Sequence, residues 1–122
     1  MVDDRAGRGA LSGLRVIDLA GDLAAYASRL LGDLGADVIR VEPPGGSATR
    51  LEMPLVQGPA GSASAFDLFV NAGKRSVVVD LESAAGRELL ARLISTADVL
   101  LETYPAAEAE RLGLEPATLA AA

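Results

Sequence analysis

Apolar residues along the chain occur alternately in short runs and in stripes with helical spacing. Residues 14–20 (LRVIDLA) form a short apolar run with β-branched residues at its centre, which predicts a buried strand. Leucine and alanine then recur three and four positions apart over residues 23–34, which predicts an amphipathic helix, and Gly35 follows where such a helix commonly ends. Residues 37–42 (DVIRVE) predict a second strand. A strand, a helix and a strand with short joints are typical of a right-handed parallel βαβ unit.

The pattern is interrupted over residues 43–72, where glycine and proline are frequent, and we expect a long loop there. A loop of this length in a compact domain is usually functional, or it is covered by another part of the protein. The stretch SAFDLFVN inside it is compatible with a short helix.

Regular structure resumes in the second half of the chain. Residues 76–81 predict a third strand, residues 84–96 a second amphipathic helix capped by Ser83, and residues 98–104 a fourth strand. The order βαβ, long loop, βαβα places the chain in the α/β class.

The two ends of the chain and the extent of the domain can also be predicted. The tail predicts two short helices, one ending at Gly113 and one beginning at Pro116. We expect residues 1–10 to be a flexible N-terminal arm and residues 11–122 to be part of one domain. Because a four-stranded sheet with such a long loop makes a thin domain, we expect a fragment of a longer protein.

Composition excludes several classes of function. The net charge of −6 argues against a general binder of nucleic acids or anionic membranes, and no apolar run approaches the ~20 residues of a transmembrane helix. The chain has no cysteine and no histidine, so it cannot by itself build disulfides, thiolate or imidazole metal sites, or a Ser-His-Asp triad. We therefore expect no metal site, and a cytoplasmic location is consistent with the missing cysteine.

The first turn does not carry a dinucleotide fingerprint. That fingerprint needs three glycines so that the backbone can approach a pyrophosphate. Here the turn reads AGDLAAYA, with Gly21 alone and with Asp22 placed to repel phosphate. A nicotinamide site is therefore disfavoured.

Several segments taken together resemble the family III CoA-transferases of the CaiB/BaiF type, which include formyl-CoA transferase, carnitine CoA-transferase and α-methylacyl-CoA racemase. The similar segments follow the family's order from about Leu11 onward: LSGLRVIDLA, LLGDLGADVIRVEPPGG, NAGKRSVVVDLES, ADVLLETY and ERLGL. The resemblance implies that the chain is the N-terminal fragment of a Rossmann-like large domain with a parallel sheet. It also implies coenzyme A, bound as acyl-CoA, a carboxylic acid as the second substrate, and an interlocked homodimer.

The resemblance places CoA contacts in the loop after the first strand, at the ends of the third and fourth strands, and at one later arginine. Strand C-termini and helix N-termini offer unpaired N–H groups, and an arginine can bind phosphate through two N–H groups. Val79 and Leu81 are equally compatible with plain core, whereas Arg111, alone on a short helix, has less structural reason to be there. The matching residues are Leu23, Ala24, Val79, Asp80, Leu81, Glu82, Thr103, Tyr104, Pro105 and Arg111.

Lys74, the only lysine of the chain, and Arg75 belong to the family's GKRS block before the third strand. They could hold the long loop or a partner chain, or they could face CoA phosphates. We interpret them as structural, because charged pairs more often anchor a loop than bind a ligand.

Three CoA-facing features differ from the family pattern. The loop after the first strand reads Ala24-Ala25-Tyr26 where the family usually has Ala-Gly-Pro, Pro43 replaces a basic residue, and the fourth strand is followed by Pro105-Ala106-Ala107 instead of a glycine-containing turn. Losing glycine makes close approach of the backbone to a ligand harder.

The resemblance assigns no catalytic residue to this chain. Family transferases use a nucleophilic aspartate that forms a mixed anhydride, and racemases use a His/acid pair; both would lie beyond Ala122. The sequence thus predicts the CoA-binding portion of a CoA-transferase or racemase, inactive alone. Two alternatives are a non-catalytic relative that keeps the scaffold and dimer surfaces without CoA, and an unrelated Rossmann-type nucleotide-binding domain.

Overall fold

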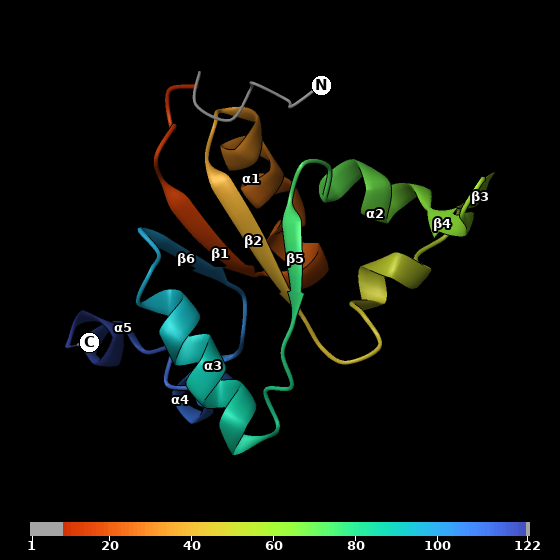
Figure 1. Cartoon of the computed structure of the whole chain (residues 1–122). Helices are drawn as coiled ribbons and strands as arrows, with labels where there is room; N and C mark the ends of the chain where they lie inside the picture. Colours follow the sequence, from red (N-terminus) through yellow and green to blue (C-terminus); the bar gives the residue numbers. More distant parts are fainter. Residues whose placement is uncertain (1–8, 122) are drawn as a thin grey trace.

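The computed structural model describes residues 9–121 and contains one main sheet of four parallel strands, in the order β5-β2-β1-β6 (Figure 1). In this sheet Ile17 lies opposite both Ile39 and Leu100. The predicted α/β class and parallel pairing are therefore confirmed. The strands are β1 (Arg15–Leu19), β2 (Asp37–Glu42), β5 (Arg75–Val78) and β6 (Val99–Glu102).

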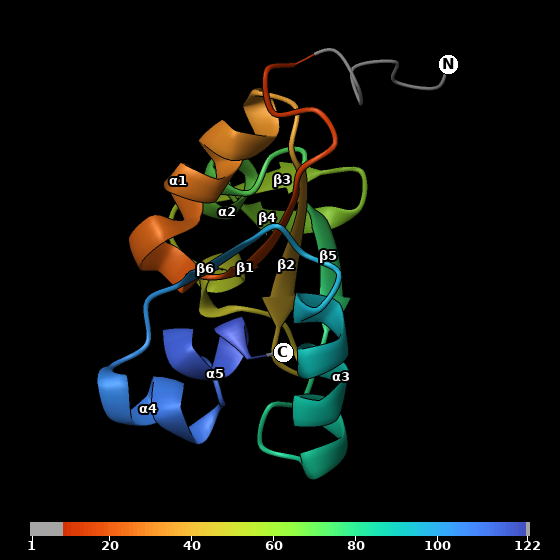
Figure 2. The same cartoon turned by 90° about the vertical axis from the view of Figure 1, so that its left-hand side faces the viewer.

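The helices lie on both sides of this sheet. Figure 2 shows α1 (Gly21–Asp33) on one side and α3 (Ala84–Ile94) on the other, with α4 (Ala106–Arg111) and α5 (Pro116–Ala120) beyond the carboxyl ends of the strands. The predicted cap of α3 is confirmed, because the Ser83 side chain accepts a hydrogen bond from the Gly86 N–H at 2.9 Å.

Residues 43–72, here called the excursion, have more regular structure than the sequence predicted. They contain a 3₁₀ turn η1 (Ala48–Leu51), a hairpin of β3 (Leu55–Gly58) and β4 (Gly61–Ser64), and α2 (Ala65–Val70). The prediction of a long loop was therefore wrong in part, while the short helix is confirmed. Two local features explain the difference: Gly61 has a φ of 106°, which lets the hairpin turn, and Ser64 Oγ caps α2 by accepting from the Asp67 N–H.

The two faces of the sheet differ in chemistry. On the α3 side, an apolar core contains Leu19, Leu90, Ala109, Leu112 and Leu114. On the α1 side, side chains two residues apart along the strands are charged and buried: Asp18 on β1, and Arg40 and Glu42 on β2. The α3 face is thus held by apolar packing, whereas the α1 face combines buried apolar residues such as Val16 and Val38 with buried ion pairs. The predicted arm over residues 1–10 lies mostly outside the described residues.

Candidate functional site

The strand order creates a switch point between β1 and β6. The connection from β1 to β2 passes through α1 on one side of the sheet, whereas the connection from β5 to β6 passes through α3 on the other side. The segment after β6 leads to α4, whose Ala109 packs in the same core as Leu90 of α3, so the loops at the carboxyl ends of β1 and β6 diverge to opposite faces. In open α/β sheets the crevice at such a point is where ligands bind.

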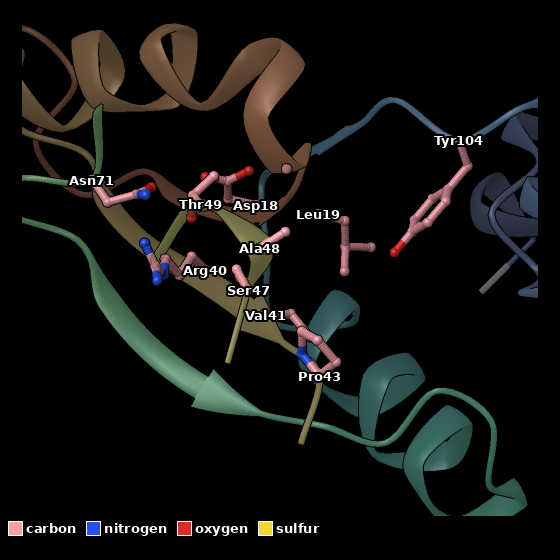
Figure 3. Close-up of a pocket in the computed structure, with 11 residues that line it drawn as sticks. Asp18, Leu19, Arg40, Val41, Pro43, Ser47, Ala48, Thr49, Asn71 and Tyr104 are labelled. Atoms are coloured by element: carbon pink, nitrogen blue, oxygen red, sulfur yellow. The ribbon is translucent and has the colours of Figure 1, made fainter. Parts of the chain in front are cut away.

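A cleft begins at the carboxyl ends of β1 and β2, beside η1, and extends to Tyr104, which follows β6. Figure 3 shows the Tyr104 side chain at one end of it, with its hydroxyl directed towards Leu19, and the polar side chains of Asp18, Arg40 and Asn71 at the other. Burial raises the pKa of the Tyr104 phenol, and the nearby Glu108 and Glu102 carboxylates add to that increase. The cleft is lined by Asp18, Leu19, Gly21, Arg40, Val41, Pro43, Ser47, Ala48, Thr49, Asn71 and Tyr104.

Of the ten residues that the resemblance singles out, Tyr104 is the one that lines this cleft. Thr103 lies beside the loop after β1, since its Oγ1 donates to the Ala20 carbonyl at 2.7 Å. Leu81 and Tyr104 both pack against the apolar core. Because the sheet is parallel, the carboxyl ends of β1, β5 and β6 lie at one end of it.

The remaining predicted residues are distributed around this end. Leu23 is largely exposed, and Ala24, with a φ of −130° and a ψ of 16°, forms the kink in α1. Asp80 accepts a hydrogen bond from the Glu82 N–H, and Pro105 precedes α4. Val79 is 2% exposed and its N–H donates to the Glu42 carbonyl, which favours a core role for this residue.

Arg111 does not stand alone, and this corrects the sequence-based picture of an isolated arginine. Its Nε and Nη2 donate to Glu108 at 3.1 and 2.5 Å, and its Nη1 and Nη2 donate to Glu82 at 3.3 and 2.9 Å. The two carboxylates raise the pKa of the guanidinium above its usual range. Arg111 therefore has structural partners in addition to any ligand.

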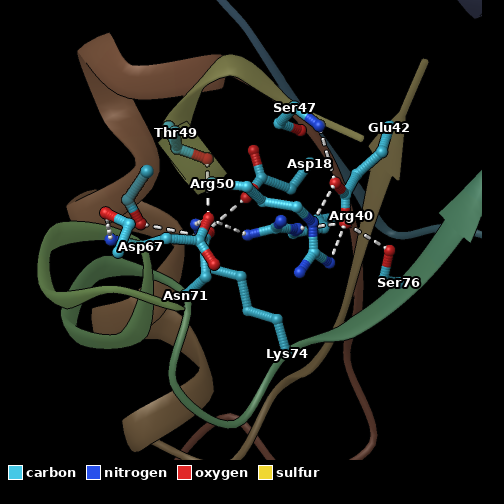
Figure 4. A network of polar contacts seen from close by, with 12 residues as sticks. Asp18, Arg40, Glu42, Ser47, Thr49, Arg50, Asp67, Asn71, Lys74 and Ser76 are labelled. Carbon is cyan, nitrogen blue, oxygen red and sulfur yellow. Dashed lines mark hydrogen bonds and ion pairs between the residues drawn. The ribbon is translucent and has the colours of Figure 1, made fainter. Parts of the chain in front are cut away.

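A buried ion network under the excursion was missed by sequence reasoning (Figure 4). Glu42 accepts hydrogen bonds from Arg40 Nε at 2.7 Å, from Arg50 Nε and Nη2 at 2.7 and 2.6 Å, and from the Ser76 hydroxyl at 2.6 Å. The Arg50 hydrogen bonds are the largest cause that holds the pKa of Glu42 far below its usual range, against the effect of burial. Glu42 thereby ties η1 and β5 to the end of β2.

The second carboxylate of the network comes from α2. Asp67 accepts from Arg40 Nη1 at 2.9 Å, from the Thr49 hydroxyl at 2.7 Å and from Asn71 Nδ2 at 3.0 Å. Burial alone would raise the pKa of Asp67, but the Thr49 and Arg40 hydrogen bonds outweigh it and lower the pKa. Arg40 thus joins β2 to α2 at the far end of the excursion. Because Asp67 also binds Thr49 and Asn71, this connection positions two residues that line the cleft.

Lys74 extends this network to β1. Its ammonium group donates to Asp18 Oδ2, to the Ala25 carbonyl and to Asn71 Oδ1, each at 2.8 Å. Burial lowers the pKa of Lys74, and Asp18 opposes that effect. The structural interpretation of Lys74 is confirmed, and Arg75 pairs with Asp37 on β2. The signal in the sequence was the presence of Asp18 and Arg40 inside otherwise apolar strands.

No helix between residues 9 and 121 is long and apolar enough to cross a membrane. Within the same residues, no group of three or more carboxylate, imidazole or thiol side chains is placed to hold a metal ion.

Comparison with known proteins identifies the family. Residues 11–122 match the sequence model of the family described as CoA-transferase family III. The chain is 43% identical over 104 residues to the succinyl-CoA:(R)-benzylsuccinate CoA-transferase subunit BbsE of Thauera aromatica, covering 84% of this chain and 25% of that protein. It is 44% identical over 110 residues to the succinate–glutarate CoA-transferase of Agrobacterium fabrum, covering 86% of this chain and 28% of the relative.

Solved structures agree with these sequence relationships. A CaiB/BaiF family protein from Brucella suis superposes with a TM-score of 0.85 at 38% identity, over 93% of this chain and 30% of the other. The chain thus spans between a quarter and a third of the length of these proteins. On the family match and on these similarities, the chain belongs to CoA-transferase family III and corresponds to an N-terminal portion of its members.

Proposed function

We propose that this chain is the CoA-binding portion of an acyl-CoA:carboxylate CoA-transferase, with the nucleophilic aspartate supplied by residues outside it. The observation that carries the proposal is the cleft at the β1–β6 switch point, which is lined by Tyr104 and lies beside Thr103. Ligands in open α/β sheets bind at such a position. Family membership supports CoA as the ligand.

The exchange itself needs a carboxylate nucleophile. That carboxylate attacks the thioester carbonyl, the C–S bond breaks, and CoA leaves as the thiolate while the acyl group is held as a mixed anhydride. The residues of this chain would hold the CoA part during these steps. Backbone N–H groups at the strand ends and the Arg111 guanidinium are suited to phosphate groups, and Tyr104 supplies a wall and a hydroxyl.

The names of the relatives support the class of substrates. The Thauera and Agrobacterium proteins are named for exchanges that involve a succinyl thioester or succinate and a second carboxylic acid. For the present protein we accordingly propose an acyl-CoA and a free carboxylic acid as the pair of substrates. The interlocked homodimer and the cytoplasmic location remain predictions, and racemisation of an acyl-CoA is the other chemistry known in the family.

A second candidate is a relative that keeps the fold but has lost CoA binding. The observation in its favour is that Arg111 is already held by Glu82 and Glu108. The absence of the family's glycines at residues 24–26 after β1 and at residues 105–107 after β6 also favours this candidate.

Isothermal titration of the chain with CoA separates the two candidates. The proposal predicts saturable binding, and it predicts no transfer of an acyl group between acyl-CoA and any carboxylic acid by this chain alone. No binding at millimolar CoA would favour the non-catalytic candidate, and turnover above background would show that a nucleophile lies within these residues.

A further inference from the structure

The Arg111 guanidinium has two usable edges, and the structure assigns a different carboxylate to each. The edge formed by Nε and Nη2 faces Glu108, which is three residues earlier on α4. The edge formed by Nη1 and Nη2 faces Glu82, which is 29 residues earlier, in the connection from β5 to α3. Both pairings use two N–H groups, the arrangement that arginine also uses for phosphate.

The two carboxylates are not held equally. Glu108 is fixed to Arg111 by their spacing on one helix, and its side chain is 38% exposed. The Glu82 side chain is 78% exposed, and its shorter contact with Arg111 is 2.9 Å, against 2.5 Å for the shorter contact of Glu108. Exposed ion pairs of this kind contribute little, because water and salt screen them. Glu82 can therefore leave Arg111 more easily than Glu108 can.

We propose that Glu82 is a carboxylate competitor for the phosphate-binding edge of Arg111, and that CoA binds by displacing it while Glu108 keeps the guanidinium oriented. This inference rests on the proposed CoA-binding function and gives Glu82 a role opposite to that of a CoA ligand. When Glu82 leaves, Nη1 and Nη2 become available together, and a phosphate group can accept from both. A phosphate and the Glu82 carboxylate cannot occupy that edge at once, since both are anions.

The surroundings of Arg111 allow Glu82 to be displaced by a side-chain movement alone. The Arg111 guanidinium and the Glu108 carboxylate both lie near the Tyr104 hydroxyl, and Arg87 Nη1 donates to the Leu81 and Glu82 carbonyls, which fixes the backbone of that segment. The backbone of residue 82 is thus held in place, while its exposed side chain can rotate away from Arg111 into solvent. The exchange requires a change of one side chain and no movement of α4.

Three glutamine variants test the proposal, because each removes one negative charge. Glu82→Gln removes the competitor, Glu108→Gln removes the orienting group, and Glu110→Gln removes an exposed charge on α4 that has neither role. CoA is titrated into each variant by calorimetry at moderate salt. We expect Glu82→Gln to bind CoA about threefold or more tightly than Glu110→Gln, in line with the small strength of an exposed ion pair, and Glu108→Gln to bind no more tightly than Glu110→Gln.

The same substitution in an Arg111→Ala background shows whether the effect acts through Arg111. There Glu82→Gln should change the affinity no more than Glu110→Gln does. Equal affinities for the Glu82 and Glu110 variants in the parent chain would overturn the competitor role and leave the proposed function standing. Failure of every variant to bind CoA would overturn the proposed function, and the exchange with it.

Discussion

Lys74 Nζ lies 2.8 Å from Asp18 Oδ2, and the two side chains are 1% and 4% exposed. These residues are 56 positions apart in the chain. Their contact joins the carboxyl-terminal half of β1 to the residue that precedes β5, across the strand β2 that lies between them. The pair is therefore a tertiary connection under the excursion and not a surface feature.

Removing one partner of this pair should be strongly destabilising. Lys74→Met leaves Asp18 as a buried carboxylate without its cation, and we expect a loss of about 3–5 kcal/mol in the free energy of unfolding. Urea denaturation measures this loss. The neighbouring change Arg75→Met is the control: it breaks a pair whose side chains are 62% and 39% exposed, and it should cost no more than about 1 kcal/mol. Similar losses for both variants would contradict the assignment of Lys74 to the buried network.

The pH dependence of stability should report on Glu42. Its pKa is lowered in the folded protein, so unfolding takes up a proton as the pH falls below the ordinary glutamate value of 4.5. The contribution of Glu42 is therefore complete above that pH and declines below it. We expect the unfolding free energy to fall less steeply with acidification in Glu42→Gln than in the parent chain, as measured by urea denaturation between about pH 3 and pH 6. Parallel profiles for the two proteins would show that Glu42 is not coupled to folding in this way.

Two glycines inside helices should respond oppositely to alanine. A Cβ at Gly86 in α3 would lie 1.7 Å from the Asp80 carbonyl oxygen, whereas a Cβ at Gly32 in α1 would meet Val38 Cγ2 at 3.5 Å. Helix propensity favours alanine at both positions by about 1 kcal/mol. We expect Gly32→Ala to be stabilising by up to that amount, and Gly86→Ala to be destabilising by about 1–3 kcal/mol because the backbone must shift. Thermal unfolding of both variants tests the pair, and stabilisation by Gly86→Ala would contradict the close packing of α3 on the end of β5.

Arg111→Ala should weaken CoA binding by about tenfold or more if the guanidinium binds a phosphate through two N–H groups. Arg111→Lys should recover only part of the loss, because one ammonium group cannot reproduce two parallel hydrogen bonds. Arg92→Ala on α3 is the control and should bind CoA as the parent does. Arg87, also on α3, cannot serve as this control, because its Nη1 donates to the Leu81 and Glu82 carbonyls and its removal would disturb the segment that holds Glu82. Unchanged affinity in Arg111→Ala would remove Arg111 from the site and leave the family unaffected.

The chain should self-associate through exposed apolar surface. Tyr26 on α1 and Phe69 on α2 stack with ring centroids 5.7 Å apart, yet they are 49% and 56% exposed. Exposed aromatic surface of this kind is typical of interfaces. We expect light scattering to show oligomers that Phe69→Asp reduces and Thr96→Asp, an equal charge change at an exposed polar position, does not. A monodisperse monomer at high concentration would contradict this prediction.

Local pattern determined most of the architecture. The apolar runs and helical stripes fix the four parallel strands and α1 and α3, because burial on both faces of a sheet requires near-continuous apolar strands and one apolar stripe on each covering helix. The hairpin in the excursion was missed because its residues 55–63 are largely exposed and show no clear alternation. Short strands outside the core leave only a weak signal in the sequence.

The sequence by itself also determined the family, because the motifs that carry the resemblance are contiguous. What only the tertiary structure decided is which charges meet. Asp18 and Lys74, Arg40 and Asp67, and Glu82 and Arg111 are 56, 27 and 29 positions apart. Such pairs follow no periodic pattern, because an ion pair depends on distance and burial. The first two arise only once β1, β2 and β5 are aligned and the excursion is folded over them, and the third arises once α4 lies beside the connection from β5 to α3.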